Sequence, residues 1–193
     1  RVMALFRLST AKTRLLDLGC GNGRWYETLR DLVWAYEGVD FSTPNIHYAR
    51  KCRLGPHVNF EVGASDQIGS LPLQYAPYDF VLSCGLFVYL NDEQVDATLR
   101  ALLPLLQPEA QIYVRTSVSV MGKRLTLKDF PSETLKADYH GIYRPPEEYE
   151  AFFSAIFMPE GFSVVATDLL LNEEIGAKKE TNQQYWLLER KRL

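Results

Sequence analysis

The sequence predicts an α/β protein whose mainly parallel sheet carries helices on both faces. Short apolar segments typical of buried strands alternate along the chain with segments of helical composition. The length of 193 residues suits one domain, and a hydrophobic content of 47% suffices for a single core. A net charge of -3 provides no broad basic face, so a nucleic acid partner is disfavoured.

The first half of the chain alternates strands with helices. Mostly apolar runs predict strands over residues 13–18, 35–41, 58–63 and 78–84. Helical composition follows the first strand over residues 24–32. After the second strand, Ser42 or Thr43 can cap a helix that starts at Pro44, and we expect this helix to reach residue 52.

The middle of the chain holds one clear helix and one long connection. A helix capped by Asn91 or Asp92 is expected through Leu106, because its apolar residues recur at the spacing of one helix face. A fifth strand follows over residues 111–116. Residues 117–144 then lack a sustained periodicity, and a connection of this length usually has a functional use or forms a small lid.

The last part of the chain returns to regular elements. Two prolines precede a helix expected over residues 147–156. Strands are predicted over residues 162–171 and 184–189, with a polar and charged connector between them. We expect these two strands to form a hairpin at the edge of the sheet.

Three glycines at alternate positions follow the first strand, in the run Leu15-Leu16-Asp17-Leu18-Gly19-Cys20-Gly21-Asn22-Gly23. Glycine lets the backbone turn sharply and lets a ligand approach it closely. The spacing does not fit a dinucleotide fingerprint, because the third glycine of that pattern falls on Arg24 or Tyr26. The turn also lacks the Gly-Lys-Ser/Thr ending of a P-loop.

Two acidic residues indicate which ligand this turn would hold. Asp17 lies two residues before the turn, where its charge disfavours a pyrophosphate but can serve an amino group. Asp40 ends the second strand, 17 residues past Gly23, where it can accept both hydroxyls of a ribose. S-adenosylmethionine (SAM) has a ribose, an amino group and a sulfonium but no phosphate, so SAM is the predicted cofactor.

These features resemble the class I SAM-dependent methyltransferase family over nearly the whole chain. The similar segments are the glycine turn, the ribose motif Val39-Asp40-Phe41-Ser42, the "FDxV" strand Tyr78-Asp79-Phe80-Val81-Leu82, and Leu105-Leu106-Gln107-Pro108 as the "LLKPGG" turn. The resemblance implies a seven-stranded sheet in the order 3-2-1-4-5-7-6 with strand 7 antiparallel. It also implies S-adenosylhomocysteine (SAH) as the product.

The chain departs from the family pattern in two places. The family often has an aspartate after strand three that reaches the adenine amino group, but Ala64 stands there, so Ser65 or Asp66 is expected to replace it. The helices that commonly precede the first strand are mostly absent. We therefore expect residues 1–193 to form a single methyltransferase domain that lacks those helices, with residues 117–146 as an acceptor-side insert.

The cofactor site is expected at the carboxyl ends of the strands, where ligands bind in such sheets. The predicted cofactor-binding residues are Asp17, Gly19, Cys20, Gly21, Gly23, Asp40, Phe41, Ala64, Ser65, Asp66, Cys84, Gly85, Leu86 and Phe87. For Leu86, and for Tyr89 as an acceptor contact, packing under the next helix is an equally good interpretation. We expect Cys20 to be a small buried thiol rather than a nucleophile.

The acceptor pocket is predicted from the cluster of polar and aromatic residues at the end of the insert. His140 and Tyr139 are the candidate catalytic residues, and the substrate-binding candidates are Tyr89, Arg115, Tyr143 and Arg144. A histidine bonded to backbone, and arginines paired with nearby carboxylates such as Glu147, Glu148 or Asp138, are the alternative interpretations.

The leading functional hypothesis is methyl transfer from SAM to oxygen or nitrogen of a small molecule such as a sugar, a metabolite or a natural-product intermediate. The alternatives are an RNA or protein methyltransferase, and a SAM-binding regulatory protein without turnover. Ser83-Cys84-Gly85-Leu86 replaces the Asn/Asp-Pro-Pro-Tyr/Phe motif of many enzymes that methylate base amines, which argues against that subclass.

Cysteine spacing and hydropathy indicate the environment in which the protein is expected to work. Cys20, Cys52 and Cys84 form no Cys-x-x-Cys pair and no cluster with histidine, so we predict no metal site and a reducing, cytoplasmic environment. No apolar run is long enough to predict a membrane span. The sequence leaves the oligomeric state open.

Overall fold

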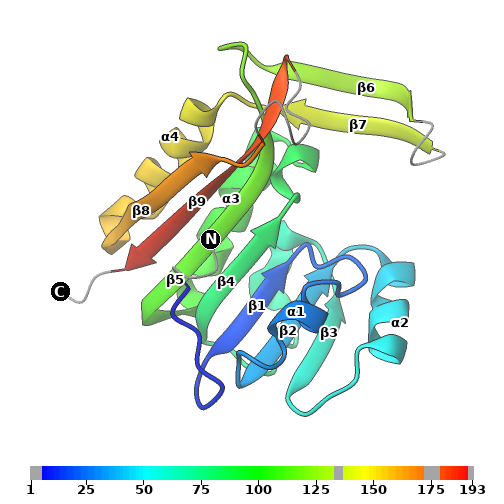
Figure 1. Cartoon of the computed structure of the whole chain (residues 1–193), viewed down its shortest axis with the longest axis vertical. Helices are drawn as coiled ribbons and strands as arrows, with labels where there is room; N and C mark the ends of the chain where they lie inside the picture. Colours follow the sequence, from blue (N-terminus) through cyan, green and yellow to red (C-terminus); the bar gives the residue numbers. More distant parts are fainter. Residues whose placement is uncertain (1–5, 133–136, 172–178, 191–193) are drawn as a thin grey trace.

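The computed structural model describes residues 6–132, 137–171 and 179–190, with side chains for all of these except 130–139. Its main feature is a seven-stranded sheet in the order β3-β2-β1-β4-β5-β9-β8 (Figure 1). Because β8 and β9 are the sixth and seventh strands of this sheet along the chain, the predicted order 3-2-1-4-5-7-6 is confirmed. Strands β1 to β5 pair in parallel, and β9 is antiparallel to both of its neighbours.

The strand bounds follow the predicted ranges closely, apart from the fifth strand and the last, whose predicted range is 184–189. The strands of the main sheet are β1 (Arg14–Leu18), β2 (Ala35–Asp40), β3 (Val58–Val62), β4 (Tyr78–Cys84), β5 (Leu106–Ser119), β8 (Phe162–Leu169) and β9 (Thr181–Arg190). Strand β5 is longer than predicted at both ends. It pairs with β4 from Leu106 and with β9 as far as Ser119, so its second half is fixed by a strand distant in sequence.

Three helices begin close to where the sequence predicts, although the one expected to reach Leu106 ends at Leu102; the first helix does not reach its predicted length. The helices are α1 (Tyr26–Leu29), α2 (Thr43–Cys52), α3 (Asp92–Leu102) and α4 (Pro146–Ile156). Ser42 caps α2, and Asn91 caps α3 through a reciprocal capping box with Gln94. Helix α1 is much shorter than the expected 24–32, and Trp25 at its start makes no side-chain capping bond.

The core consists of two apolar layers, one on each face of the sheet. Helices α3 and α4 cover one face, where Leu99, Phe153 and Trp186 belong to one buried cluster (Figure 1). Helices α1 and α2 lie on the other face with Tyr26 and Ile46 in a second cluster. Both faces of β1 and β4 are therefore buried, which explains why these strands are almost wholly apolar.

The insert forms a separate hairpin of β6 (Leu125–Ser132) and β7 (Ala137–Tyr143) rather than an irregular segment. Figure 1 shows it extending away from the end of the main sheet at which β1 and β4 finish. The register shifts between Leu127 and Phe130, and Asp129 takes a left-handed φ of 48°. This irregularity breaks the alternation of side chains and hides the hairpin from sequence analysis. In the described part of the chain, the helices are too short and polar to span a bilayer.

Candidate active site

A cavity of about 690 Å³ opens at the carboxyl ends of β1, β2, β3 and β4. Ten of the predicted site residues line it: Gly19, Asp40, Phe41, Ala64, Ser65, Asp66, Cys84, Gly85, Leu86 and Tyr89. Loops after adjacent parallel strands meet at this edge, which is why residues far apart in sequence converge here. Six lining residues were missed by the sequence analysis: Val39, Ser42, Asn45, Gly63, Leu90 and Gln94.

The glycine turn after β1 uses glycine for two different reasons. Gly19, Gly21 and Gly23 all have left-handed φ values, of 76°, 53° and 73°. A Cβ on Gly23 would lie 2.8 Å from Cε1 of Phe60, and one on Gly19 would lie 3.0 Å from Cβ of Leu86. The turn therefore packs against β3 and against the wall of the cavity as well as reversing the chain.

Asp40 holds the glycine turn and the end of β2 together. Its Oδ2 accepts a hydrogen bond from the Gly21 amide at 2.8 Å, and its Oδ1 accepts one from the Ser42 amide at 2.9 Å. A carboxylate has about four lone-pair positions, so these two bonds leave capacity for further donors. Because Asp40 lines the cavity, it fits the two hydroxyls of a ribose.

Asp17 is buried behind the glycine turn, with one oxygen satisfied and the other not. The Tyr36 hydroxyl donates to Oδ2, whereas Oδ1 has no partner among the described residues. The pKa of Asp17 is raised to about 7, because burial and, to a smaller extent, the nearby charge of Asp40 raise it more than the hydrogen bond from Tyr36 lowers it. An unsatisfied buried oxygen is costly, so this arrangement fits a donor such as an amino group that arrives with a ligand.

The part of the cavity expected to hold the adenine of SAM differs from the common family pattern. Ala64, Ser65 and Asp66 all line the cavity at the start of η2 (Ser65–Ser70). The Ser65 and Thr98 hydroxyls share a hydrogen bond at 3.0 Å, which ties Ser65 to α3. Of the two residues expected to replace the missing aspartate, Asp66 is thus the better acceptor for an exocyclic amine.

The two cysteines at the site are neutral thiols. Burial raises the pKa of Cys84 to about 12, despite the opposing charge of Arg115. Burial also raises the pKa of Cys20 well above its usual value, with the charges of Asp17 and Asp40 adding to the effect. Neither thiol has the thiolate character of a nucleophile at neutral pH, in agreement with the expectation for Cys20.

Some predicted cofactor residues lie behind the cavity lining rather than in it. Besides Asp17, these are Cys20, Gly21, Gly23 and Phe87. Gly21 acts through its amide on Asp40, and Phe87 is buried under the turn that supplies Leu86 and Tyr89. Their positions beside the lining leave direct contact with the cofactor as a prediction.

Of the predicted acceptor residues, Tyr89 lines the cavity, and the others whose side chains the structure describes do not. Arg115 lies opposite Cys84 on β5, half-buried, with its guanidinium carbon 5.7 Å from the centre of the Trp25 ring. His140 is exposed on β7, with each ring nitrogen 3.4 Å from an atom of Asp129. Tyr143 ends β7 outside the lining, and the Tyr139 side chain falls outside the described residues. A catalytic role for His140 and Tyr139 stays a prediction.

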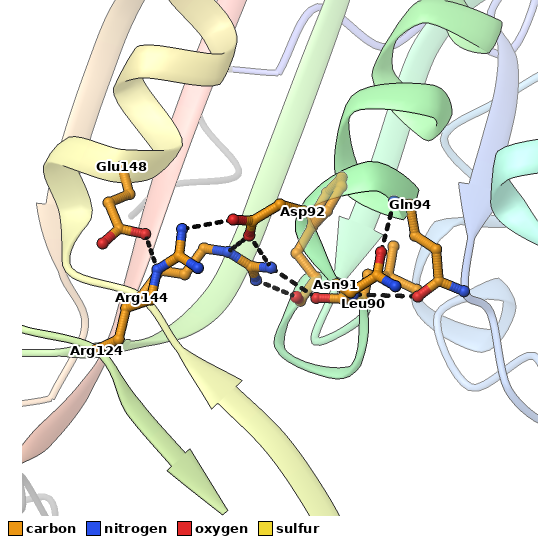
Figure 2. A network of polar contacts seen from close by, with 8 residues as sticks. Leu90, Asn91, Asp92, Gln94, Arg124, Arg144 and Glu148 are labelled. Carbon is orange, nitrogen blue, oxygen red and sulfur yellow. Dashed lines mark hydrogen bonds and ion pairs between the residues drawn. The ribbon is translucent and has the colours of Figure 1, made fainter.

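Arg144 has a structural place that the sequence analysis did not assign to it. It is fully buried, and its guanidinium bonds Asp92 and the carbonyl groups of Phe87 and Leu90 (Figure 2). The sequence analysis considered pairing with carboxylates near it in sequence, but the partner is 52 residues away. The geometry thus corrects the expectation that Arg144 itself faces the acceptor.

Comparison with known proteins finds methyltransferases. A family described as "Methyltransferase domain" matches residues 15–109. Phosphoethanolamine N-methyltransferase 1 of Triticum aestivum is 26% identical over 98% of this chain and 37% of its own length. A ubiquinone biosynthesis O-methyltransferase of Chelativorans sp. strain BNC1 is 27% identical over 74% of this chain and 57% of its own length. The chain thus spans less than two thirds of the length of either relative.

A solved structure supports the same assignment at the level of the fold. Phosphoethanolamine N-methyltransferase 2 of Haemonchus contortus, in complex with phosphomonomethylethanolamine and SAH, superposes with a TM-score of 0.72 at 14% identity. The superposition covers 99% of this chain and 51% of that chain. Sequence match and sheet topology agree, and the chain belongs to the class I SAM-dependent methyltransferase family.

Proposed function

We propose that this chain transfers the methyl group of SAM to an oxygen or nitrogen atom of a small-molecule acceptor. The observation that carries the proposal is the cavity beside the glycine turn, in which Asp40 is held by two backbone amides and keeps capacity for more hydrogen bonds. This arrangement suits a ribose without a phosphate, because no cationic side chain lines the cavity among the described residues.

Two residues of the cavity lining and Asp17 behind it can be assigned to different parts of SAM. Asp40 would accept the ribose hydroxyls, Asp66 the adenine amino group, and Asp17 the amino group of the methionyl end. SAM supplies a methyl group already activated on sulfur. The chain must therefore mainly hold donor and acceptor in line and exclude water, and correct placement alone can contribute several kcal/mol. The apolar surfaces of Leu86 and Tyr89 at the cavity suit that task.

Several observations favour a small acceptor over a macromolecule. The acidic sequence pI of about 5.7 does not favour binding to RNA. The two curated relatives are named for methylation of phosphoethanolamine on nitrogen and for ubiquinone biosynthesis on oxygen. Arg115, half-buried opposite Cys84 and without an ion pair among the described residues, is the best candidate to bind an anionic group on the acceptor.

The first experiment tests the cofactor. SAH at a hundred times its dissociation constant should stabilise the protein by about 2.7 kcal/mol, which raises the melting temperature by roughly 5–10 °C. NAD should give no shift. Asp40→Ala should abolish the shift with SAH, while Asp31→Ala, which removes an exposed carboxylate far from the cavity, should retain it. An Asp40→Ala protein that keeps the full shift contradicts the ribose assignment.

The second experiment separates an enzyme from a binding protein. Labelled SAM should transfer its methyl group to at least one member of a panel of amines, phenols and sugars in neutral and anionic forms. Arg115→Met should raise KM for anionic acceptors on the order of tenfold or more, with neutral acceptors little affected, because a hydrogen bond to a charged group is lost. Tight SAH binding without transfer to any acceptor or to RNA would instead support the regulatory alternative.

A further inference from the structure

One wall of the cavity comes from the segment between β4 and α3. Leu86, Tyr89 and Leu90 line the cavity from this segment, and Gln94 lines it from the first turn of α3. The segment contains a single turn of 3-10 helix, η3 (Phe87–Tyr89), with hydrogen bonds of 3.0 and 3.4 Å of its own. Such a short turn depends on outside contacts to keep one conformation.

Arg144 supplies those contacts. It donates to the Phe87 carbonyl at 3.2 Å and to the Leu90 carbonyl at 2.7 Å, so it holds both ends of the turn (Figure 2). Its Nε and Nη2 also donate to Oδ1 of Asp92, at 2.9 and 2.7 Å. The planar guanidinium makes all four contacts at once from a fully buried position, which a lysine ammonium cannot reproduce.

Asp92 also binds the residue at the other end of the β6–β7 hairpin. Arg124, immediately before β6, lies 2.8 Å from Oδ2 of Asp92 and also pairs with Glu148 on α4. Arg144 immediately follows β7. Although burial acts to raise it, the pKa of Asp92 is lowered because both arginines bond and attract the carboxylate. A single carboxylate at the start of α3 therefore joins the hairpin to the cavity wall.

We propose that Asp92 and Arg144 are positioning residues for the cavity wall, and that Arg124 couples the hairpin to the same wall. An ion pair whose arginine is fully buried adds little net stability compared with apolar packing, so we assign it mainly to fixing one geometry. Here the fixed geometry is the path from Phe87 to Leu90, and hence the place of Tyr89 at the cavity. The proposal rests on the proposed function, because it assigns the wall to a SAM-binding cavity.

The test compares this network with an ion pair of similar length on the same helix. Arg100 and Asp96 on α3 lie 2.8 Å apart on the exposed side, so Asp96→Asn is a matched control for Asp92→Asn. SAH affinity by calorimetry should fall on the order of tenfold for Asp92→Asn and for Arg144→Lys. It should stay within about twofold of the parent value for Asp96→Asn.

Amide hydrogen exchange gives a readout that does not depend on ligand. Asp92→Asn should speed exchange of residues 86–92, and the control should not. Arg124→Gln should speed exchange in β6 and β7 and weaken SAH binding less than Asp92→Asn does, because Arg144 still holds the wall. A role in stability alone would lower the melting temperature in Asp92→Asn and leave SAH affinity and exchange of residues 86–92 unchanged, which would overturn the proposal.

The outcomes separate this proposal from the proposed function. If the parent protein does not bind SAH, the cofactor assignment fails, and exchange of residues 86–92 still decides whether Asp92 positions the wall. If the parent binds SAH and Asp92→Asn binds it equally well, the positioning proposal alone fails. Should Arg144→Lys not fold, Asp92→Asn decides the matter, since asparagine keeps an oxygen acceptor at a side chain that is 40% exposed.

Discussion

Asp17 shows how one buried side chain can make ligand binding depend on pH. Its unsatisfied Oδ1 lies in a buried position, and burial brings its pKa close to neutrality. The ionised form is therefore disfavoured until a donor or a cation approaches. An ammonium group near Asp17 would favour ionisation, so ligand binding and loss of the proton from Asp17 should be linked.

We predict that SAH affinity rises with pH up to about 7, by up to about tenfold per pH unit, because the ionised carboxylate binds the amino group better. Above about pH 8 the affinity should fall again as a free amino group loses its proton. Calorimetry across pH 5.5–9 measures the profile.

Two substitutions check the origin of that profile. Tyr36→Phe removes a hydrogen bond that lowers the pKa of Asp17, so the rise in affinity should move to higher pH. Asp17→Asn should bind more weakly and lose the rising limb below pH 7. An Asp17→Asn protein with the parent profile would show that another group controls the pH dependence.

Several predicted residues that line the cavity lie at strand ends, whereas two of those the sequence misses, Asn45 and Gln94, lie on helices. Gly19, Asp40 and Cys84 follow from the rule that ligands bind at the carboxyl ends of parallel strands. Asn45 and Gln94 reach the cavity from the first turns of α2 and α3, where their polarity looks like ordinary capping. Their place in the first turn after a cap was the only available signal.

At the scale of elements, the glycine turn must satisfy both a backbone conformation and a close packing contact. Gly23→Ala and Gly122→Ala both place a Cβ on a residue with left-handed φ, of 73° and 66°. The new Cβ meets Phe60 at 2.8 Å in the first variant and nothing within 4 Å in the second. The pair therefore separates the packing contact from the cost of the backbone conformation.

We predict that Gly23→Ala lowers the free energy of unfolding by about 1–3 kcal/mol more than Gly122→Ala does, because only Gly23→Ala overpacks the core. Both should lose about 1–2 kcal/mol from the left-handed conformation. Urea denaturation measures both. Equal losses would mean that Phe60 moves aside at no cost, and that the turn has more room than the structure shows.

The elements that the sequence predicts poorly owe their form to distant contacts. The second half of β5 depends on β9, and β6 and β7 depend on each other across an irregular register. Helix α1 has a helical composition over residues 24–32, but only Tyr26–Leu29 are helical. Strands that are buried on both faces can be predicted from their own sequence, whereas the extent of β5, β6 and β7 depends on the strands with which they pair.

At the scale of the whole molecule, the sheet order was predictable from the resemblance to the class I SAM-dependent methyltransferase family, which implies it. The glycine turn, the acidic end of β2 and the apolar β4 carry that resemblance, and the last two strands are predicted independently as an edge hairpin. Strands β6 and β7 form a separate two-stranded sheet, so each of them pairs with only one other strand. Two-stranded sheets are marginally stable in isolation.

We predict that stability is unevenly distributed over the chain as a result. Native-state hydrogen exchange should be on the order of a hundredfold or more faster for amides of β6 and β7 than for those of β1 and β4, which are buried on both faces. Mass spectrometry of exchanged peptides measures this directly. Uniform protection would mean that the hairpin unfolds only with the rest of the molecule.

The shared carboxylate at the roots of the hairpin has a consequence for diversification. Because the chain leaves the body at Arg124 and returns at Arg144, with both anchored on Asp92, the loop between them can change in length or content without moving its points of attachment. Exchange of that loop alone would then let the same SAM-binding cavity work with a different acceptor.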